Sequence, residues 1–160
     1  MSEFTIAQAA RFQGQQVTLR GWLYNLRESG KLLFPQFRDG TGIMQAVVSK
    51  ADVSPEVWER TTTLTQESSV IAHGTVRADK RAPGGYELVL NDLTVVQRVP
   101  TDQPYPISPK EHGVDFLMSQ RHLWMRSAKQ SALLRLRHEV IAAIRDFFDS
   151  NGFILTDAPI

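Results

Sequence analysis

The segment Leu32–Arg38 alternates two kinds of side chain, and one of its faces carries groups that suit a flat, polar ligand. Phe34 shares a face with Gln36 and Arg38, whereas the opposite face holds the apolar set Leu33, Pro35 and Phe37. The apolar set is the better core face, so the pattern predicts that Phe34 lies outside beside a guanidinium. Such a ring suits stacking on a nucleic-acid base, which contributes about 1–3 kcal/mol. The alternative is that Phe34 packs under a loop or under Trp22, because most strand aromatics are buried.

Four further residues could take part in the same contact. Gln45 lies in the apolar strand sequence IMQAVV, and its amide offers donors and an acceptor to a base edge such as that of uracil. Arg27 and Lys31 flank a turn and could hold phosphates. Glu87 follows a Gly-Gly turn and could accept from a base amino group. Each also has an ordinary interpretation, as a solvated amide, a charged turn or a strand-surface carboxylate.

The composition excludes several other classes of function. The 160 residues include no cysteine and four scattered histidines, so thiolate metal sites are excluded and a zinc site is not expected. No P-loop or nucleophile elbow is present. There is no run of about 18 apolar residues and no secretion-signal pattern, so the cytoplasm is the expected compartment. The net charge is only +1, but residues 11–50 hold six basic and two acidic residues, which suits a polyanion or a solvated strand surface.

The order of the predicted elements indicates the fold. A short helix at Thr5–Phe12 comes first, and a second helix beginning near Pro55 separates the third strand from the fourth. Three strands, a helix and two strands is the order of the OB-fold, a five-stranded Greek-key barrel. An SH3-like barrel or a sandwich stays open. The chain is therefore expected to be mainly β, and α+β overall. The strands predicted from period-two alternation are residues 17–27, 32–38, 43–49, 70–79 and 86–97.

The pattern changes after the fifth strand. Four prolines between residues 99 and 113 predict an extended, semi-rigid linker. Apolar residues then recur at three- and four-residue steps, which predicts a long helix capped by Ser127 and ended at Gly152. The sequence FILTDAPI predicts a strand that stops at Pro159. One helix and one strand cannot stand alone as a domain. The expected division is a barrel at 1–98, a linker at 99–114 and part of a second domain at 115–160.

Three stretches together resemble one family. GWLYNLRESGKLLFPQFRDGTGIMQAVVS resembles the N-terminal barrel of the aspartyl-, asparaginyl- and lysyl-tRNA synthetase group, through F-x-x-x-R-D-G-x-G and I-x-Q-x-V. YPISPKEHGVDFLMSQRHLWMRS resembles the asparaginyl branch, because its P-K-E-H element differs from typical aspartyl and lysyl linkers. VIAAIRDFFDSNGFILTDAPI resembles class II motif 1, a long helix followed by a strand that ends in proline. The resemblance runs from about Val17 to Ile160.

The resemblance implies roles for particular residues. Phe34 matches the aromatic residue that stacks on the middle anticodon base, a uracil, and Gln45 matches the glutamine that hydrogen-bonds it. Arg27 matches an arginine on the anticodon-loop side, and Glu87 matches a glutamate near the first anticodon base. A one-residue slip of the fifth strand would move Glu87 to the other face, so its role stays open at this point. The basic residues Lys31 and Arg38 complete the expected anticodon-binding set.

The resemblance also implies properties of an intact enzyme. It implies activation of asparagine with ATP and Mg2+, transfer to tRNA(Asn), and a homodimer. Motifs 2 and 3 are absent, so this chain alone is expected to bind neither cofactor nor metal, to hold no catalytic residue and to be inactive. Two alternatives stay open: an aspartyl-type enzyme that charges both aspartate and asparagine tRNAs, and a stand-alone OB module for single-stranded nucleic acid. The expected motif 1 dimer residues are Ile144, Phe147, Phe148 and Pro159.

Overall fold

The computed structural model describes residues 4–158 and divides into two compact units, Met1–Pro109 and Lys110–Ile160. Each unit is described by itself. The described part of the first unit contains every strand that the alternation predicts, and its short N-terminal helix is a 3-10 helix. The bounds are η1 Ile6–Phe12, β1 Gln16–Ser29, β2 Leu32–Arg38, β3 Ile43–Ser49, α1 Pro55–Thr62, β4 Ser69–Ala78, η2 Pro83–Gly85 and β5 Tyr86–Gln97.

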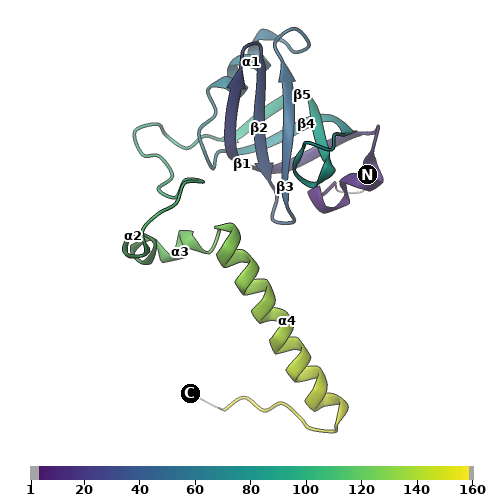
Figure 1. Cartoon of the computed structure of the whole chain (residues 1–160), viewed down its shortest axis with the longest axis vertical. Coiled ribbons are helices and arrows are strands. Elements are labelled where there is room, and N and C mark those ends of the chain that lie inside the picture. Colours follow the sequence, from purple (N-terminus) through teal and green to yellow (C-terminus); the bar gives the residue numbers. More distant parts are fainter. Residues whose placement is uncertain (1–3, 159–160) are drawn as a thin grey trace. The chain divides into compact units, whose positions relative to one another are not determined.

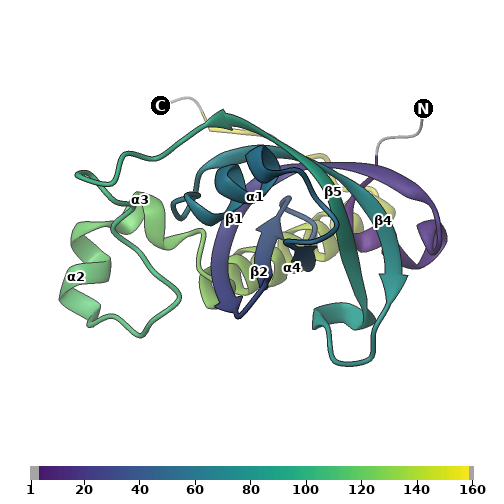
Figure 2. The same ribbon diagram turned by 90° about the horizontal axis from the view of Figure 1, so that it is seen from above.

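The five strands close into a barrel in the order β1-β2-β3-β5-β4, and β4 pairs back with β1. The pairing of β3 with β5 is parallel, whereas the other four pairings are antiparallel. Figure 1 shows β1, β2 and β3 side by side, with β4 and β5 crossing behind them. Helix α1 joins β3 to β4 at one end of the barrel. The hairpin between β4 and β5 projects from the barrel (Figure 2). This order of strands with a helix between β3 and β4 confirms the predicted OB-fold.

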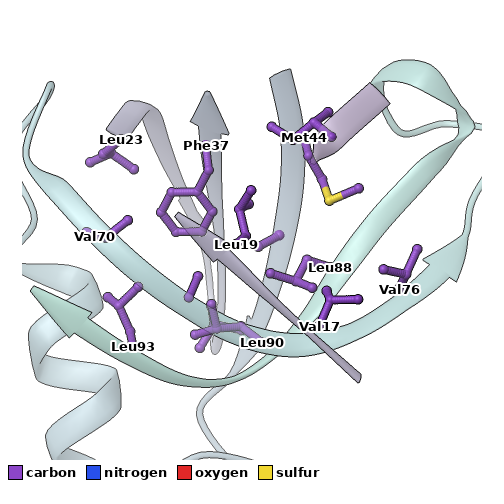
Figure 3. Packing of buried hydrophobic residues seen from close by; sticks show 14 of the residues in the cluster. Val17, Leu19, Leu23, Phe37, Met44, Val70, Val76, Leu88, Leu90 and Leu93 are labelled. Atoms are coloured by element: carbon purple, nitrogen blue, oxygen red, sulfur yellow. The ribbon is translucent and has the colours of Figure 1, made fainter. Parts of the chain in front are cut away.

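Alternate residues of the strands fill the interior of the barrel. In β2, every second residue from Leu33 to Phe37 is buried, and the residues between them face outward. Figure 3 shows the Phe37 ring among side chains of the other four strands, which include Leu19, Met44, Val70 and Leu90. Full burial of side chains of this size contributes about 1.5–3 kcal/mol each. The interior therefore holds each strand in register and determines which residues remain outside.

Strand β1 bends so that it can pair with both β2 and β4. A Cβ atom at Gly21 would overlap the carbonyl oxygen of Arg38, so only glycine permits this approach of the two backbones. The register is also shifted between Leu23 and Asn25. A shift of this kind increases the local twist of a strand. The small residue and the irregularity together let β1 curve around the barrel.

The loop before β4 fastens the start of the predicted linker to the barrel. The Thr65 hydroxyl donates to the Val99 carbonyl at 2.6 Å, and the Val99 amide donates to the Ser68 hydroxyl at 3.1 Å. The Gln66 amide donates to the Ile107 carbonyl at 2.9 Å, and the Ile107 side chain is buried. We call Thr65, Gln66 and Ser68 the linker dock. Through these bonds, part of the expected linker belongs to the first compact unit.

The second unit contains helices α2 Val114–Ser119, α3 Arg121–Trp124 and α4 Ala128–Ser150. Figure 1 shows α4 as one continuous helix. The Ser127 hydroxyl accepts from the Gln130 amide at its start, and Gly152 has a φ of 82° just beyond its end, as predicted. The prediction of a strand after α4 is wrong for the described residues 153–158, which form no strand. A strand needs a hydrogen-bonded neighbour, and the described part of this unit offers none.

Candidate nucleic-acid interface

The β1–β2 hairpin presents an aromatic ring and a guanidinium on its outer face. Phe34 and Arg27 are cross-strand partners, and the guanidinium carbon of Arg27 lies 5.1 Å from the centre of the Phe34 ring. Arg27 is exposed and Phe34 is half-buried. A cation over an aromatic ring contributes about 0.5–1 kcal/mol at an exposed site. Arg27 therefore helps to fix the orientation of a ring that remains partly open to solvent. Trp22 does not pack over Phe34 as in the alternative, because it lies opposite Arg38.

Gln45 of β3 faces the same side of the barrel. Its register partners are Gln36 of β2 and Glu87 of β5. The side chain of Gln45 is half-buried, and it forms no hydrogen bond within the part of the chain that the structure describes. An amide carries two N–H donors and an accepting oxygen. These free groups can bind the edge of a base that stacks on Phe34.

Glu87 lies on this outer face. The sequence pattern alone does not decide on which face of its strand Glu87 lies. Glu87 lies opposite Gln45 and opposite Arg77 of β4. Its side chain is 2% exposed, and Arg77 Nε and Nη2 donate to Glu87 Oε1 at 2.9 and 2.5 Å. The Arg77 side chain is 57% exposed. Sequence reasoning misses Arg77, because only the pairing of β4 with β5 identifies it as the partner of this carboxylate.

Arg38 has a different environment from that of Arg27. Arg38 Nη2 donates to Glu67 Oε2 at 2.7 Å, and these side chains are 14% and 5% exposed. Glu67 has a φ of 64°, a backbone conformation that is rare outside glycine, and its amide donates to the Leu23 carbonyl at 2.7 Å. The Arg38–Glu67 pair therefore joins β2 to the loop that carries the linker dock. Because its charge is paired with Glu67, Arg38 is better suited to positioning this loop than to binding a phosphate.

Lys31 lies in the turn that connects β1 to β2. Gly30 beside it has a φ of 60°, which this tight connection requires, and Lys31 is exposed. Its carbonyl accepts from the Lys50 amide at 3.0 Å, while its ammonium forms no ion pair with any described residue. Lys31 and Arg27 thus bring two accessible positive charges to the hairpin that carries Phe34. Such charges can hold phosphates at little desolvation cost.

The residues expected at a dimer interface lie on α4 of the second unit. Ile144, Phe147 and Phe148 are 52%, 63% and 46% exposed. Pro159 lies outside the described residues. An apolar helix face open to solvent requires a covering partner. Nothing in the described part of this unit buries the face.

The described residues do not gather the ligands of a metal. Between residues 4 and 158, no three side chains of histidine, aspartate or glutamate come close enough together to hold an ion. Mg2+ requires oxygen ligands in a nearly octahedral arrangement. Among the helices that are described, none is both long and apolar enough to cross a membrane.

Two family models and several known proteins match the sequence of this chain. Residues 17–96 match the family described as the OB-fold nucleic acid binding domain, and residues 113–160 match the class II tRNA synthetases (D, K and N). The asparagine–tRNA ligase of Koribacter versatilis is 60% identical over 98% of this chain and 35% of its own length. That of Symbiobacterium thermophilum is 52% identical over 100% of this chain and 36% of its own length.

A solved structure extends the similarity to both units. The asparaginyl-tRNA synthetase from Pyrococcus horikoshii, complexed with asparaginyl-adenylate, is 36% identical with a TM-score of 0.89, over 100% of this chain and 37% of that chain. The present chain thus spans little more than a third of the length of the relatives that it matches. It belongs to the OB-fold nucleic acid binding domain family, and its barrel is joined to a segment of a class II (D, K and N) tRNA synthetase domain.

Proposed function

We propose that the barrel reads the anticodon loop of tRNA(Asn) and that the chain is part of an asparagine–tRNA ligase. The observation that carries the proposal lies on one outer face, where the half-buried Phe34 ring under Arg27 neighbours the unbonded amide of Gln45. A single-stranded base can stack on the ring and present its edge to the amide. Relatives that match nearly the whole chain are asparagine–tRNA ligases, which supports this choice of tRNA.

In the proposed complex, the residues divide into base contacts and backbone contacts. Phe34 stacks on the middle base, a uracil, and Gln45 binds its edge. Glu87 accepts from an amino group of the neighbouring base, and the exposed Arg77 that covers its carboxylate moves aside to admit that base. Arg27 and Lys31 meet phosphates of the loop. Base contacts give the specificity, whereas phosphate contacts set the position of the loop and make binding salt-dependent.

The intact enzyme is proposed to activate asparagine with ATP and Mg2+ and to transfer it to the tRNA. The described residues gather no oxygen ligand set for Mg2+. We propose that both cofactors bind in the part of the relatives that this chain does not span. We also propose that the α4 face is a homodimer contact and that the enzyme is cytoplasmic. Asparagine-dependent pyrophosphate exchange by this chain alone would contradict the proposed lack of activity.

The test compares two anticodon stem-loops at one fixed salt concentration. One loop has the anticodon GUU, and the other has its middle U changed to C. We expect the chain to bind the GUU loop at least about tenfold more tightly, which corresponds to about 1.4 kcal/mol. Gln45→Ala should abolish the difference between the loops. Phe34→Ala should weaken binding by about 1–3 kcal/mol, because the stacking surface is lost.

Two substitutions at Phe34 separate stacking from apolarity. Phe34→Tyr retains an aromatic ring and should bind nearly as tightly as the unsubstituted chain. Phe34→Leu retains an apolar side chain and should behave like Phe34→Ala. Equal binding to both loops, falling steeply with salt, would instead indicate backbone electrostatics alone. Binding to oligo-dT as tight as to the GUU loop would favour a general single-strand-binding module and overturn the proposal.

A further inference from the structure

A row of polar side chains crosses the outer face of all five strands at one level. Asn25 lies opposite Gln36, and Gln36 lies opposite Gln45. Gln45 lies opposite Glu87, and Glu87 lies opposite Arg77. Neighbouring strands are about 4.8 Å apart, so the row is roughly 19 Å long. It passes directly beside Phe34, which precedes the β2 member of the row by two residues on the same face.

Within this row, only the side chains of the two glutamines form no hydrogen bond with a described residue. Arg77 donates twice to Glu87, and Asn25 Oδ1 accepts from the next backbone amide at 3.0 Å. The side chains of Gln36 and Gln45 form no hydrogen bond with any residue between 4 and 158. Both are half-buried, and their polar atoms are still reached by solvent. Two adjacent amides, partly screened from water and unbonded, form a strip that a polar ligand edge can bind.

We infer that Gln36 is a second base-reading residue, which supplies a hydrogen bond that Gln45 cannot make. The inference rests on the proposed function, because it concerns the base that stacks on Phe34. Residues two apart on one face of a strand are separated by about 6.8 Å. This spacing is close to the width of a pyrimidine with its exocyclic groups. A base on Phe34 therefore turns its edge toward the pair formed by Gln36 and Gln45.

The chemistry of the uracil edge requires more than one amide. Its N3–H donor lies between two acceptors, O2 and O4. The Gln45 amide satisfies two of these groups, because its oxygen accepts from N3–H and its NH2 donates to one carbonyl. The second carbonyl loses contact with water against the barrel and needs another donor. The NH2 group of Gln36 is the adjacent unbonded donor in the row.

The inference is tested with Gln36→Ala in the 160-residue chain and the GUU stem-loop. Loss of one hydrogen bond should weaken binding about two- to tenfold. Gln97→Ala is the matched control, because Gln97 is an exposed glutamine at the end of β5 and should leave binding unchanged. Gln36→Met keeps the length of the side chain and removes its donors. It should match Gln36→Ala, and thermal melting checks that both variants are folded.

Modified loops test which atom Gln36 contacts. A 2-thiouridine or a 4-thiouridine at the middle position replaces one carbonyl oxygen by sulfur, a weaker acceptor. The effect of Gln36→Ala should disappear on one of these loops and persist on the other. A structural role would instead weaken binding to all loops equally, and that result would overturn the inference.

The outcome for Gln36 can be separated from that for the proposed function. If the chain prefers the GUU loop and loses this preference in Gln45→Ala, while Gln36→Ala binds normally, the inference about Gln36 is wrong and anticodon reading stands. Equal binding of the unsubstituted chain to the loops with U and C at the middle position overturns both.

Discussion

Arg77 holds the nearly buried carboxylate of Glu87, and Arg77→Ala tests how far the outer face depends on this pair. Removing one partner of a fully buried ion pair costs about 3–5 kcal/mol. Glu87 is 2% exposed, but Arg77 is 57% exposed, so water screens part of the attraction. We therefore expect the free energy of unfolding of the barrel to fall by about 1–3 kcal/mol. This loss corresponds to a decrease in Tm of roughly 4–20 °C.

Denaturant unfolding followed by tryptophan fluorescence measures this loss. Trp22 and Trp58 belong to the barrel, so a Trp124→Phe background removes the signal of the second unit. Arg20→Ala is the matched control, because Arg20 is an exposed β1 arginine that forms no ion pair with the described residues. The control should change the free energy of unfolding by no more than about 0.5 kcal/mol.

A double-mutant cycle shows whether the loss comes from the carboxylate. Glu87→Gln removes the charge, so Arg77→Ala should cost little in that background. The difference between the two backgrounds measures the coupling of the pair. A loss below about 0.5 kcal/mol, or equal losses in both backgrounds, would refute the reasoning. Glu87 would then not depend on Arg77 for its place on the outer face.

Three further outcomes are expected. In the β4–β5 hairpin, hydrogen bonds from Arg81 lower the pKa of Asp79 to about 2, and Arg81→Ala should return it toward 3.8 in an NMR titration. Because the pKa of Asp79 is lower in the folded chain, any stability that its ionised carboxylate contributes is complete above the pKa of the unfolded chain and is lost as the pH falls toward 2. An unchanged titration midpoint of Asp79 in Arg81→Ala would contradict the role of Arg81. Ser68→Ala removes the acceptor of the Val99 amide and should speed hydrogen exchange at that amide without affecting core amides, whereas an equal rate would argue against the linker dock. Phe37→Ala deletes a fully buried ring and should cost about 3–5 kcal/mol in denaturant unfolding, and a cost below about 1 kcal/mol would mean that the interior collapses around the gap.

Local sequence determined the elements and the two faces of each strand. Period-two alternation assigned Phe37 to the interior and Phe34 to the outer face, because successive side chains of a strand point to opposite sides. Pro55 and Ser127 marked the starts of α1 and α4. The hydroxyls of Ser54 and Ser127 each accept from a backbone amide three residues later, which fixes these starts. Gly152 marked the end of α4, because it adopts a positive φ readily. These features depend on near neighbours, so they can be predicted without the fold.

The neighbours of the site residues could not be predicted in the same way. The two arginines of the predicted set look alike in the sequence, yet Arg27 covers Phe34 and Arg38 pairs with Glu67. The partner of Glu87 depends on the register between β4 and β5, which includes two irregularities. A shift of one residue exchanges the two faces of a strand, so pattern alone left the role of Glu87 open.

The strand predicted after α4 also depends on residues that are distant in the chain. Residues 153–158 have a suitable pattern, but a strand forms only where a neighbouring backbone supplies hydrogen bonds. Periodicity and capping are local, so the sequence by itself determined the strands, their two faces and the helix ends. The binding roles of Phe34 and Gln45 came from the resemblance to the synthetase barrel and stay predictions. Only the tertiary structure decided which side chains are paired and which remain free to bind, because ion pairs and strand register join residues far apart in the chain.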